Sequence, residues 1–303
     1  MTEQMKKHLT VPTGRIDVVL DTDTYNEIDD QFAVSYLLRS KEKLNTVALY
    51  AAPFLNERSE SAADGMEKSY NEIHKLLAFL QESVPVYRGS TAFLSDEETP
   101  VVSDAARDLC ARAKEYTEES PLYVVAIGAI TNVASALLLD PTIAKSIVVV
   151  WLGGHAHHYP HTHEFNMLQD VAAARVVMRA DLPFIQAPCM GVVDRFALSY
   201  AEMQYFLKGK NSLADFLVTN AEEIVKGYVT DDFWSRVIWD VVPIAWLLND
   251  GGRFMADRLS DTYLPDYDRH YEKTPLEKPM TYIYDIAKDA LFRDLVKKLT
   301  ENA

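Results

Sequence analysis

Short apolar runs rich in β-branched residues recur along the chain, and each is followed by a longer segment whose apolar residues repeat at helical spacing. Strands that alternate with helices in this way pair in parallel, because each helix carries the chain back across the sheet. The sequence therefore predicts a Rossmann-like α/β fold with a mostly parallel open sheet flanked by helices. The expected strands cover residues 16–20, 46–50, 84–87, 122–127, 147–152 and 184–187. The expected crossover helices cover residues 30–38, 65–80, 104–116, 132–139 and 170–178.

The chain beyond residue 200 has a different pattern. Helices are expected over residues 213–225 and 237–248, followed by a short strand near residues 280–284 and a final helix. No repeat, low-complexity tract or linker divides the 303 residues, so we expect a single domain over residues 1–303 with a flexible N-terminal segment over residues 1–14. In such a sheet ligands bind beyond the carboxyl ends of the strands, so functional residues are expected there.

The charge balance excludes some partners. The chain has 45 acidic and 30 basic residues and a formal charge of −15, which makes binding along a phosphate backbone unfavourable. No stretch approaches the roughly 18 apolar residues of a membrane span, and the N-terminus lacks the apolar run of a signal peptide. Cys110 and Cys189 show neither metal nor redox spacing. We therefore expect a cytoplasmic protein that binds neither nucleic acid nor membrane.

An acidic cluster follows the first expected strand. The sequence DTDTYNEIDD places five acids within ten residues, and like charges this close raise one another's pKa unless a cation holds them. Helix N-capping explains one or two of these acids but not five, and carboxylate oxygens suit Ca²⁺ or Mg²⁺. The segment predicts a divalent metal site. A phosphatase of the D-x-D-x-T/V kind, with Asp21 as nucleophile, stays an alternative, although Tyr25 stands at the Thr/Val position. The acids are Asp21, Asp23, Glu27, Asp29 and Asp30.

A histidine-rich loop lies at the same expected edge of the sheet. Five of the eight histidines fall in residues 151–166, but their spacing matches no zinc signature, so a hydrated loop and a catalytic use stay open. Glu164 and Asn166 would point the same way from an extended chain and could bind hydroxyls of a small polar ligand. Asp240, a lone acid entering an apolar helix, is either coordinated or an N-cap.

Four blocks, in order, resemble the inosine/uridine-preferring nucleoside hydrolases, and the likeness extends over roughly residues 16–298. This resemblance implies the nucleoside hydrolase fold and cleavage of the N-glycosidic bond of ribonucleosides to free base and ribose. It also implies a role in purine or pyrimidine salvage and a homodimer or homotetramer. The blocks are the Asp-x-Asp and Asp-Asp-x-x-Ala pattern in residues 21–33, AIGAITNVA at 126–134 with PVYRG at 85–89 before it, the Gly-Gly loop ending in E-F-N at 153–166, and WDVVPIA at 239–245.

The resemblance also assigns roles by position. It implies one Ca²⁺ ion, in preference to Mg²⁺, and a general base, Asp23, that activates a metal-bound water. Asp29 and Asn166 match positions that bind the ribose 2′- and 3′-hydroxyls, and Glu164 matches one that binds the 5′-hydroxyl. The implied metal ligands are Asp23, Asp30, Asp240 and the backbone carbonyl of Ile127.

Two departures from the family pattern affect the sugar side. Five residues, TYNEI, separate Asp23 from Asp29 where the common motif has three, so Asn26 or Glu27 is expected to enter the site. Counting back from Glu164 places His158 where the Gly-Gly loop usually supplies an Asn for the 5′ side of the sugar. We therefore expect Asn26 and His158 among the substrate-binding residues.

A third departure affects the leaving base. Trp239 replaces the histidine that protonates the base in many members, so it is expected to stack on the base. The acid that activates the leaving base is left open among Tyr228, His157 and His158. A non-catalytic protein that binds ribosides or sugars is a further alternative, because the acidic site could persist without that acid.

Overall fold

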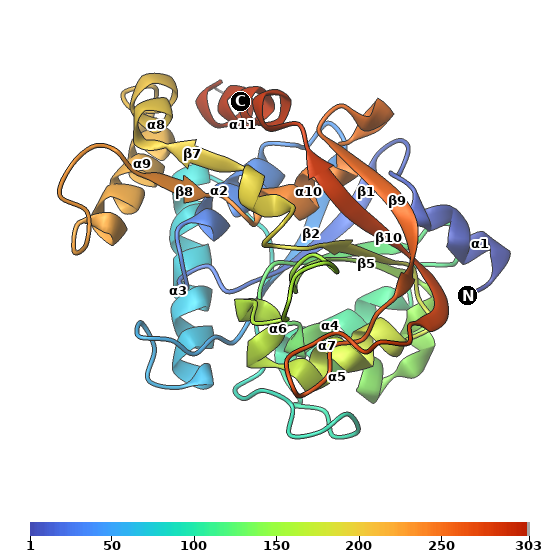
Figure 1. Cartoon of the computed structure of the whole chain (residues 1–303). Helices are drawn as coiled ribbons and strands as arrows, with labels where there is room; N and C mark the ends of the chain where they lie inside the picture. The colour runs from blue at the N-terminus through green and yellow to red at the C-terminus, as the bar shows by residue number, and fades with distance from the viewer. Residues whose placement is uncertain (302–303) are drawn as a thin grey trace.

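The computed structural model describes residues 1–301 and has an eight-stranded sheet at its centre (Figure 1). The strand order is β3-β2-β1-β4-β5-β6-β10-β9, and every pair is parallel except the antiparallel pair of β10 and β9. The predicted α/β fold class is therefore confirmed. The strands are β1 (Ile16–Thr22), β2 (Leu44–Ala51), β3 (Val86–Arg88), β4 (Leu122–Ala126), β5 (Ile147–Leu152), β6 (Phe184–Ala187), β9 (Met255–Thr262) and β10 (Leu276–Ile286), and a separate pair joins β7 (Ala197–Ser199) to β8 (Ser235–Val237).

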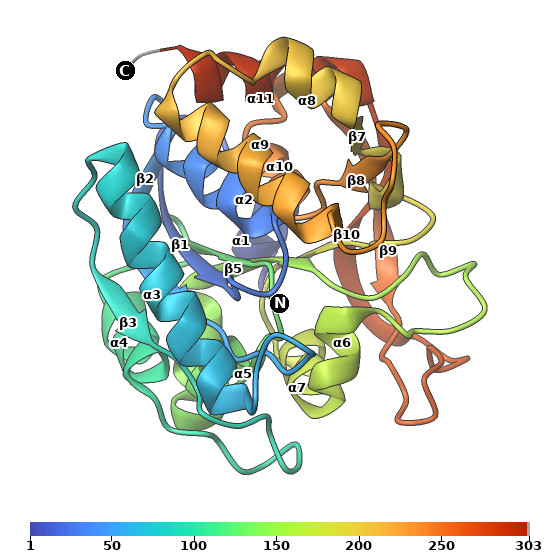
Figure 2. The same ribbon diagram turned by 90° about the vertical axis from the view of Figure 1, so that its left-hand side faces the viewer.

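Helices cover both faces of the sheet (Figure 1). Side chains alternate between the two faces along each strand, so both faces present side chains on which helices can pack. Val18 and Leu20 of β1 pack into one core, while Val19 between them packs into the other. The first core holds α2 (Asp29–Leu38), α3 (Ala62–Leu80), α9 (Ser212–Val225), α10 (Val241–Leu247) and α11 (Lys288–Thr300), and Figure 2 looks onto α2, α3 and α9. The second holds α4 (Asp104–Ala113), α5 (Thr131–Leu139) and α7 (Val171–Arg179).

Several short elements were not predicted. Strand β9 was not predicted because five of its eight residues are polar or charged, as suits a strand at the edge of a sheet. The predicted helix over residues 237–248 begins only at Val241, because residues 235–237 pair as β8. The other unpredicted elements are α1 (Glu3–Lys6), α6 (Phe165–Gln169), β7, α8 (Tyr200–Phe206) and the 3₁₀ turns η1 (Lys7–Leu9), η2 (Pro141–Lys145), η3 (Val193–Arg195) and η4 (Asp250–Gly252).

The N-terminal segment differs from the flexible one that we expected. Thr2 caps α1 by accepting from the backbone N–H of Met5, and η1 follows. Met5 and Leu9 are 1% and 4% exposed, and the Thr281 hydroxyl of β10 donates to the carbonyl of Leu9. Residues 2–9 are therefore structured, since their two apolar side chains are buried.

The strand order fixes where a ligand can bind. From β1 the chain moves outward to β2 and β3, then returns to the other side of β1 and continues through β4, β5 and β6. The two halves diverge between β1 and β4, and in open parallel sheets the crevice beyond the carboxyl ends of such strands binds ligands. Within residues 1–301 the structure contains no helix with the length and apolar character needed to span a bilayer.

Candidate active site

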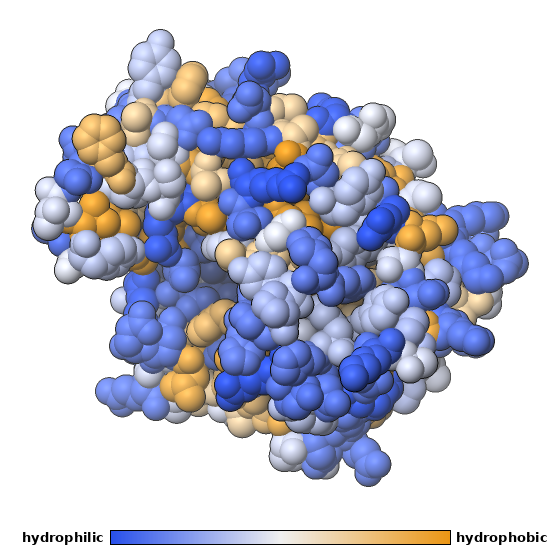
Figure 3. Space-filling model, viewed as in Figure 1, coloured by the Kyte–Doolittle hydropathy of each residue, from blue (hydrophilic) through white to orange (hydrophobic). Residues whose placement is uncertain are grey.

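A cavity of about 200 Å³ lies beyond the carboxyl ends of β1, β4, β5 and β6, and Figure 3 shows the surface hollowed on this side of the molecule. It brings together segments that are far apart in the sequence, including most of the predicted site residues. Asp23 and Asp30 are almost completely buried, and they are not part of the lining within residues 1–301. The lining consists of Asn26, Glu27, Asp29, Ile127, Leu152, His155, His163, Glu164, Phe165, Asn166, Cys189, Met190, Trp239 and Asp240.

Three aspartates lie close together at the site. One oxygen from each of Asp29, Asp30 and Asp240 lies within 4.8 Å of the oxygens of the other two. Burial, and then the charges of neighbouring acids, raises the pKa of Asp29 and of Asp240 well above the usual range. Burial also raises the pKa of Asp30 to about 7, although a hydrogen bond of 2.5 Å donated by the Thr22 hydroxyl lowers it. Such a group of acids holds its charge only if a cation is present.

Asp23 completes this acidic group. Both of its carboxylate oxygens are buried and have no hydrogen-bond partner within residues 1–301. Burial, and then the charge of Asp30, raises its pKa well above the usual range. The chain passes very close on one side, since a Cβ added to Gly128 would meet Oδ1 of Asp23 at 2.9 Å. A side chain at position 128 would therefore displace the carboxylate of Asp23.

Local structure explains why these acids are not used as helix caps. The turn after β1 closes through the N–H of Asn26, which donates to the carbonyl of Asp23 at 2.7 Å. The N-cap position of α2 is Ile28, and neither that cap nor Asp240 at the start of α10 makes a side-chain capping bond. The N-cap explanation of these carboxylates therefore fails. Within residues 1–301, no ion pair involves Asp21, Asp23, Asp29, Asp30 or Asp240.

The E-F-N segment is not extended as we expected. Glu164 is the N-cap of α6, and its carboxylate accepts from the backbone N–H groups of Gly154, Asn166 and Met167 at 2.8 to 2.9 Å. Glu164 thereby ties the start of the histidine-rich loop to its end. The amide of Asn166 donates to the carbonyl oxygens of Ile127 at 3.2 Å and Leu152 at 3.0 Å. Its own carbonyl oxygen, an acceptor, is left for a ligand hydroxyl.

The histidine-rich loop contributes different histidines from the one predicted. His155 and His163 line the cavity, whereas His158 is exposed, close to Gly191, and does not. His157 packs among the rings of Tyr263, Tyr271 and Tyr282 and lies outside the lining. Desolvation by burial lowers the pKa of both His155 and His157 to about 4.

A glycine and a tyrosine fix the course of this loop. Gly154 has a φ of +74°, and a Cβ there would meet the hydroxyl oxygen of Tyr271 at 2.2 Å. That hydroxyl donates to the carbonyl of His155 at 2.9 Å and accepts from the Gln186 amide at 3.0 Å. Counting along the sequence therefore misplaced the histidine, because the loop turns at Gly154 in a conformation that side chains disfavour.

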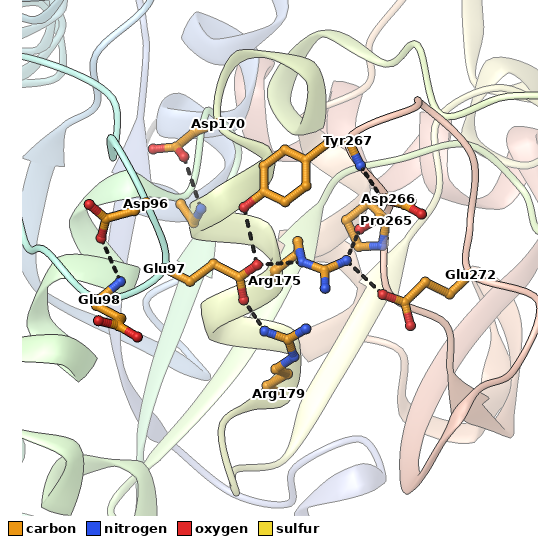
Figure 4. A network of polar contacts seen from close by, with 11 residues as sticks. Asp96, Glu97, Glu98, Asp170, Arg175, Arg179, Pro265, Asp266, Tyr267 and Glu272 are labelled. Atoms are coloured by element: carbon orange, nitrogen blue, oxygen red, sulfur yellow. Dashed lines mark hydrogen bonds and ion pairs between the residues drawn. The ribbon is translucent and has the colours of Figure 1, made fainter.

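A charged network holds the segment that carries Tyr271 (Figure 4). Arg175 of α7 donates to Glu97 at 2.6 Å, to Glu272 at 2.7 Å and to the carbonyl of Pro265 at 2.6 Å. Glu97 also accepts from Arg179 and, at 3.1 Å, from the Tyr267 hydroxyl. The arginines thus join the loop before α4 to the connection between β9 and β10.

The prediction missed some of the lining residues. Cys189 and Met190 follow the carboxyl end of β6, where the strand-end rule directs attention, but their side chains suggest no particular chemistry. Burial raises the pKa of the Cys189 thiol well above its usual range. Leu152 and Phe165 give the cavity apolar walls that no motif marks.

Comparisons with known proteins identify the family of this chain. The profile of the family described as inosine-uridine preferring nucleoside hydrolase matches residues 18–278. A pyrimidine-specific ribonucleoside hydrolase, RihA of Klebsiella pneumoniae (strain 342), is 29% identical over 149 residues, and this match covers 47% of each chain, so it spans about half of that relative.

Solved structures of low sequence identity share the fold. The plant nucleoside hydrolase PpNRh1 superposes with a TM-score of 0.73 at 20% identity, over 95% of this chain and 99% of that one. An inosine-guanosine nucleoside hydrolase superposes with a TM-score of 0.75 at 14% identity, over 95% and 100%. The family profile covers most of the chain, and the chain therefore belongs to the inosine-uridine preferring nucleoside hydrolase family.

Proposed function

We propose that the protein hydrolyses the N-glycosidic bond of ribonucleosides, giving free base and ribose, and that it uses one Ca²⁺ ion. The observation that carries this proposal is the group of buried carboxylates without a cationic partner, beside a cavity where the two halves of the sheet diverge. RihA and the two solved structures are described as nucleoside hydrolases, which supports the same activity here.

The residues present fit a hard divalent cation. The donors are all oxygens, and the two oxygens of Asp23 lack any other partner within residues 1–301. Asp23, Asp30, Asp240 and the carbonyl of Ile127 would hold the ion, with Asp29 within the same reach. Ca²⁺ accepts six to eight oxygens including carbonyls, whereas Mg²⁺ keeps several waters, so this set favours Ca²⁺. A bound ion would supply a water of lowered pKa and a site for two ribose hydroxyls.

The chain's own residues supply the rest of the chemistry. Asp23 takes the proton of the attacking water, because its carboxylate makes no other bond. Asp29 accepts from one ribose hydroxyl and the free carbonyl oxygen of Asn166 from another, while Glu164 lies near the 5′-hydroxyl. The transition state resembles an oxocarbenium ion, so these negative charges stabilise it. Asn26 and Trp239 line the part of the cavity left for the base.

The phosphatase alternative has less support. Its nucleophile, Asp21, is fully buried, accepts from the Asn132 amide at 2.8 Å and does not line the cavity within residues 1–301. A phosphoryl group in the cavity would meet Asp29 and Asp240 instead. The acidic lining also disfavours a nucleotide that still carries its phosphate.

The family resemblance further supports a homodimer or homotetramer and a role in purine or pyrimidine salvage, and the unpaired spacing of the two cysteines supports a cytoplasmic location. We include these in the proposal, and light scattering of the purified protein measures the first.

The experiment is an assay of purified protein on a panel of ribonucleosides, with release of base and reducing sugar as the readout. We expect activity with Ca²⁺, its loss in EDTA, and its return when Ca²⁺ is added back. Absence of both products from every nucleoside would reject the hydrolase. Phosphate release from an aryl phosphate that is lost in Asp21→Asn would favour the phosphatase. Ca²⁺-dependent calorimetric binding of ribosides without turnover would favour the non-catalytic binder.

A further inference from the structure

An ion pair lies at the end of the cavity that follows β1. Glu27 lines the cavity and accepts a hydrogen bond from Nη2 of Arg236 in β8. Nη1 of Arg236 donates to the hydroxyl oxygen of Tyr228 at 3.1 Å, and its Nε–H is buried without an acceptor within residues 1–301. The side chains of Glu27 and Arg236 are 44% and 24% exposed, so the pair lies near the surface end of the cavity. Within residues 1–301, Arg236 is not itself among the residues that line the cavity, so its guanidinium lies directly behind Glu27, one contact away from the cavity.

The proposed function places the leaving base at this end, and the inference rests on that function. Glu164, assigned to the 5′-hydroxyl, follows β5, and the strand order puts β5 on the far side of β4 from β1, after which Glu27 lies. In a ribose ring C1′, which bears the base, and C4′, which bears C5′, lie on the two sides of the ring oxygen. A ribose held at Asp29 with its 5′ end toward Glu164 directs its base toward Glu27, beside β1.

Breaking the glycosidic bond leaves negative charge on the base nitrogen, and some group must stabilise it. Trp239 lines the cavity just before Asp240, but its indole offers a face for stacking and no acid. Arg236 precedes Trp239 by three residues, and its guanidinium contacts the lining residue Glu27. A guanidinium binds planar anions with several N–H groups at once.

We propose that Arg236, positioned by Glu27, binds the leaving base and stabilises the charge that develops on it. In this step the C1′–O bond forms as the C1′–N bond breaks, and the bonding pair departs on the base nitrogen. The water's proton passes to Asp23 and then to solvent, and the base takes its proton from solvent. Arg236 stays protonated throughout, because a guanidinium does not give up its proton in proteins.

The role of Glu27 is to hold the guanidinium in place. It belongs to TYNEI, the segment between Asp23 and Asp29 that is two residues longer than the family pattern, and it contacts Arg236, which lies 209 positions later in the sequence.

The chemistry of a guanidinium also indicates a class of base. It binds a departing base most favourably when carbonyl oxygens of the base share the negative charge. The inferred substrates are therefore ribonucleosides of oxo bases.

The test compares two leaving groups. One substrate is inosine, and the other is p-nitrophenyl β-D-ribofuranoside, whose nitrophenolate departs without help. Arg236→Gln should lower kcat on inosine about 100-fold, as loss of a charge-stabilising donor does, and change kcat on the aryl riboside less than about threefold. Glu27→Gln should give a smaller loss on inosine alone. The control is Arg195→Gln, which removes an arginine from the exposed pair with Asp285 and should alter neither rate.

The outcomes separate the inference from the proposed function. Equal losses on both substrates in Arg236→Gln would mean a merely structural role and overturn the inference. A wild-type protein that cleaves the aryl riboside but not inosine would also overturn it, while the acidic site and its sugar chemistry would stand. If the wild type cleaves the aryl riboside and no nucleoside of the panel, the proposed function fails as well.

Discussion

Two groups of buried charges in this protein are built on opposite principles. In the arginine group, Arg175 is 9% exposed and meets Glu97 and Glu272, and Arg179 meets Glu97 as well (Figure 4). In the acidic group, Asp29, Asp30 and Asp240 lie against one another, and Asp23 lies beside them with both oxygens unpartnered within residues 1–301. Carboxylates face cations in the first group and other carboxylates in the second.

The difference separates structural charges from functional ones. A buried charge is costly unless a partner and hydrogen bonds offset its lost hydration, and the arginine group supplies these within the chain. The acidic group does not, so by itself it opposes folding, and an external cation is the partner that it lacks. Removing a charge should therefore have opposite effects on stability in the two groups.

The largest expected effect is on activity in the acidic group. Asp23→Asn keeps the shape of the side chain but removes the proposed base and one of the proposed metal ligands. We expect kcat on the best nucleoside to fall at least about 10³-fold, since the roles of base and ligand are lost together.

The same variant should be no less stable than the wild type when both are metal-free, because the substitution removes one of several repelling charges. Thermal unfolding in EDTA measures this. A clear fall in the metal-free midpoint would show that Asp23 has a stabilising partner within the folded chain.

The arginine group should respond in the other way. Arg175→Met leaves Glu272 and part of Glu97 without a cation. Arg175 is 9% exposed but the two glutamates are 22% and 32% exposed, so the loss in the free energy of unfolding should lie between about 1 kcal/mol, typical of an exposed pair, and about 3 kcal/mol, typical of a buried one. Urea unfolding measures the change. The loss of activity below the unfolding transition should be smaller than in Asp23→Asn, because Arg175 reaches the cavity only through the segment that holds Tyr271. A stability equal to the wild type would mean that the pairing does not stabilise the fold.

The pH dependence of the metal-free protein should show the cost of burying Asp21, a further carboxylate of the same segment that has no cationic partner within residues 1–301. Burial raises the pKa of Asp21 to about 7, while in the unfolded chain it titrates near its ordinary value. Between about pH 5 and 7 the folded state then binds more protons than the unfolded state, so stability falls as pH rises through this window. For one such group the change is about 2 kcal/mol.

Unfolding midpoints in EDTA at pH 5 and pH 7 test this, with Asp21→Asn as the matched variant. Asn keeps an oxygen for the Asn132 amide but does not titrate, so its midpoint should depend less on pH. An unchanged pH dependence in Asp21→Asn would mean that Asp21 is ionised in the folded state.

These two groups also show what a sequence can reveal. Asp23, Asp29 and Asp30 lie within eight positions after one strand, so the motif and the strand-end rule were enough to find them. Arg175 lies 78 positions from Glu97 and 97 from Glu272, and no local pattern relates them. Charge pairs formed by tertiary packing leave no periodic signal.

The histidine-rich loop lies between these extremes. Its place beyond β5 followed from the sheet, but the choice of His158 over His155 depended on counting through a loop that turns at Gly154. The extended E-F-N segment failed similarly, because the helix start at Glu164 depends on bonds to Gly154 and Met167. Irregular loops are set by such contacts, and one sequence does not display them.

The smallest expected effect tests the comparison within the arginine group itself. Arg179 pairs with the same Glu97 as Arg175, but its side chain is 44% exposed instead of 9%. An exposed ion pair contributes at most about 1 kcal/mol, because water solvates both charges and salt screens them. Arg179→Gln should therefore change the free energy of unfolding by less than about 1 kcal/mol, and less still at high salt. Urea unfolding at two salt concentrations, beside Arg175→Met, measures both. Equal losses of stability in the two variants would show that burial does not determine how much these ion pairs stabilise the fold. The contrast with the acidic group would then depend only on whether carboxylates face cations or other carboxylates.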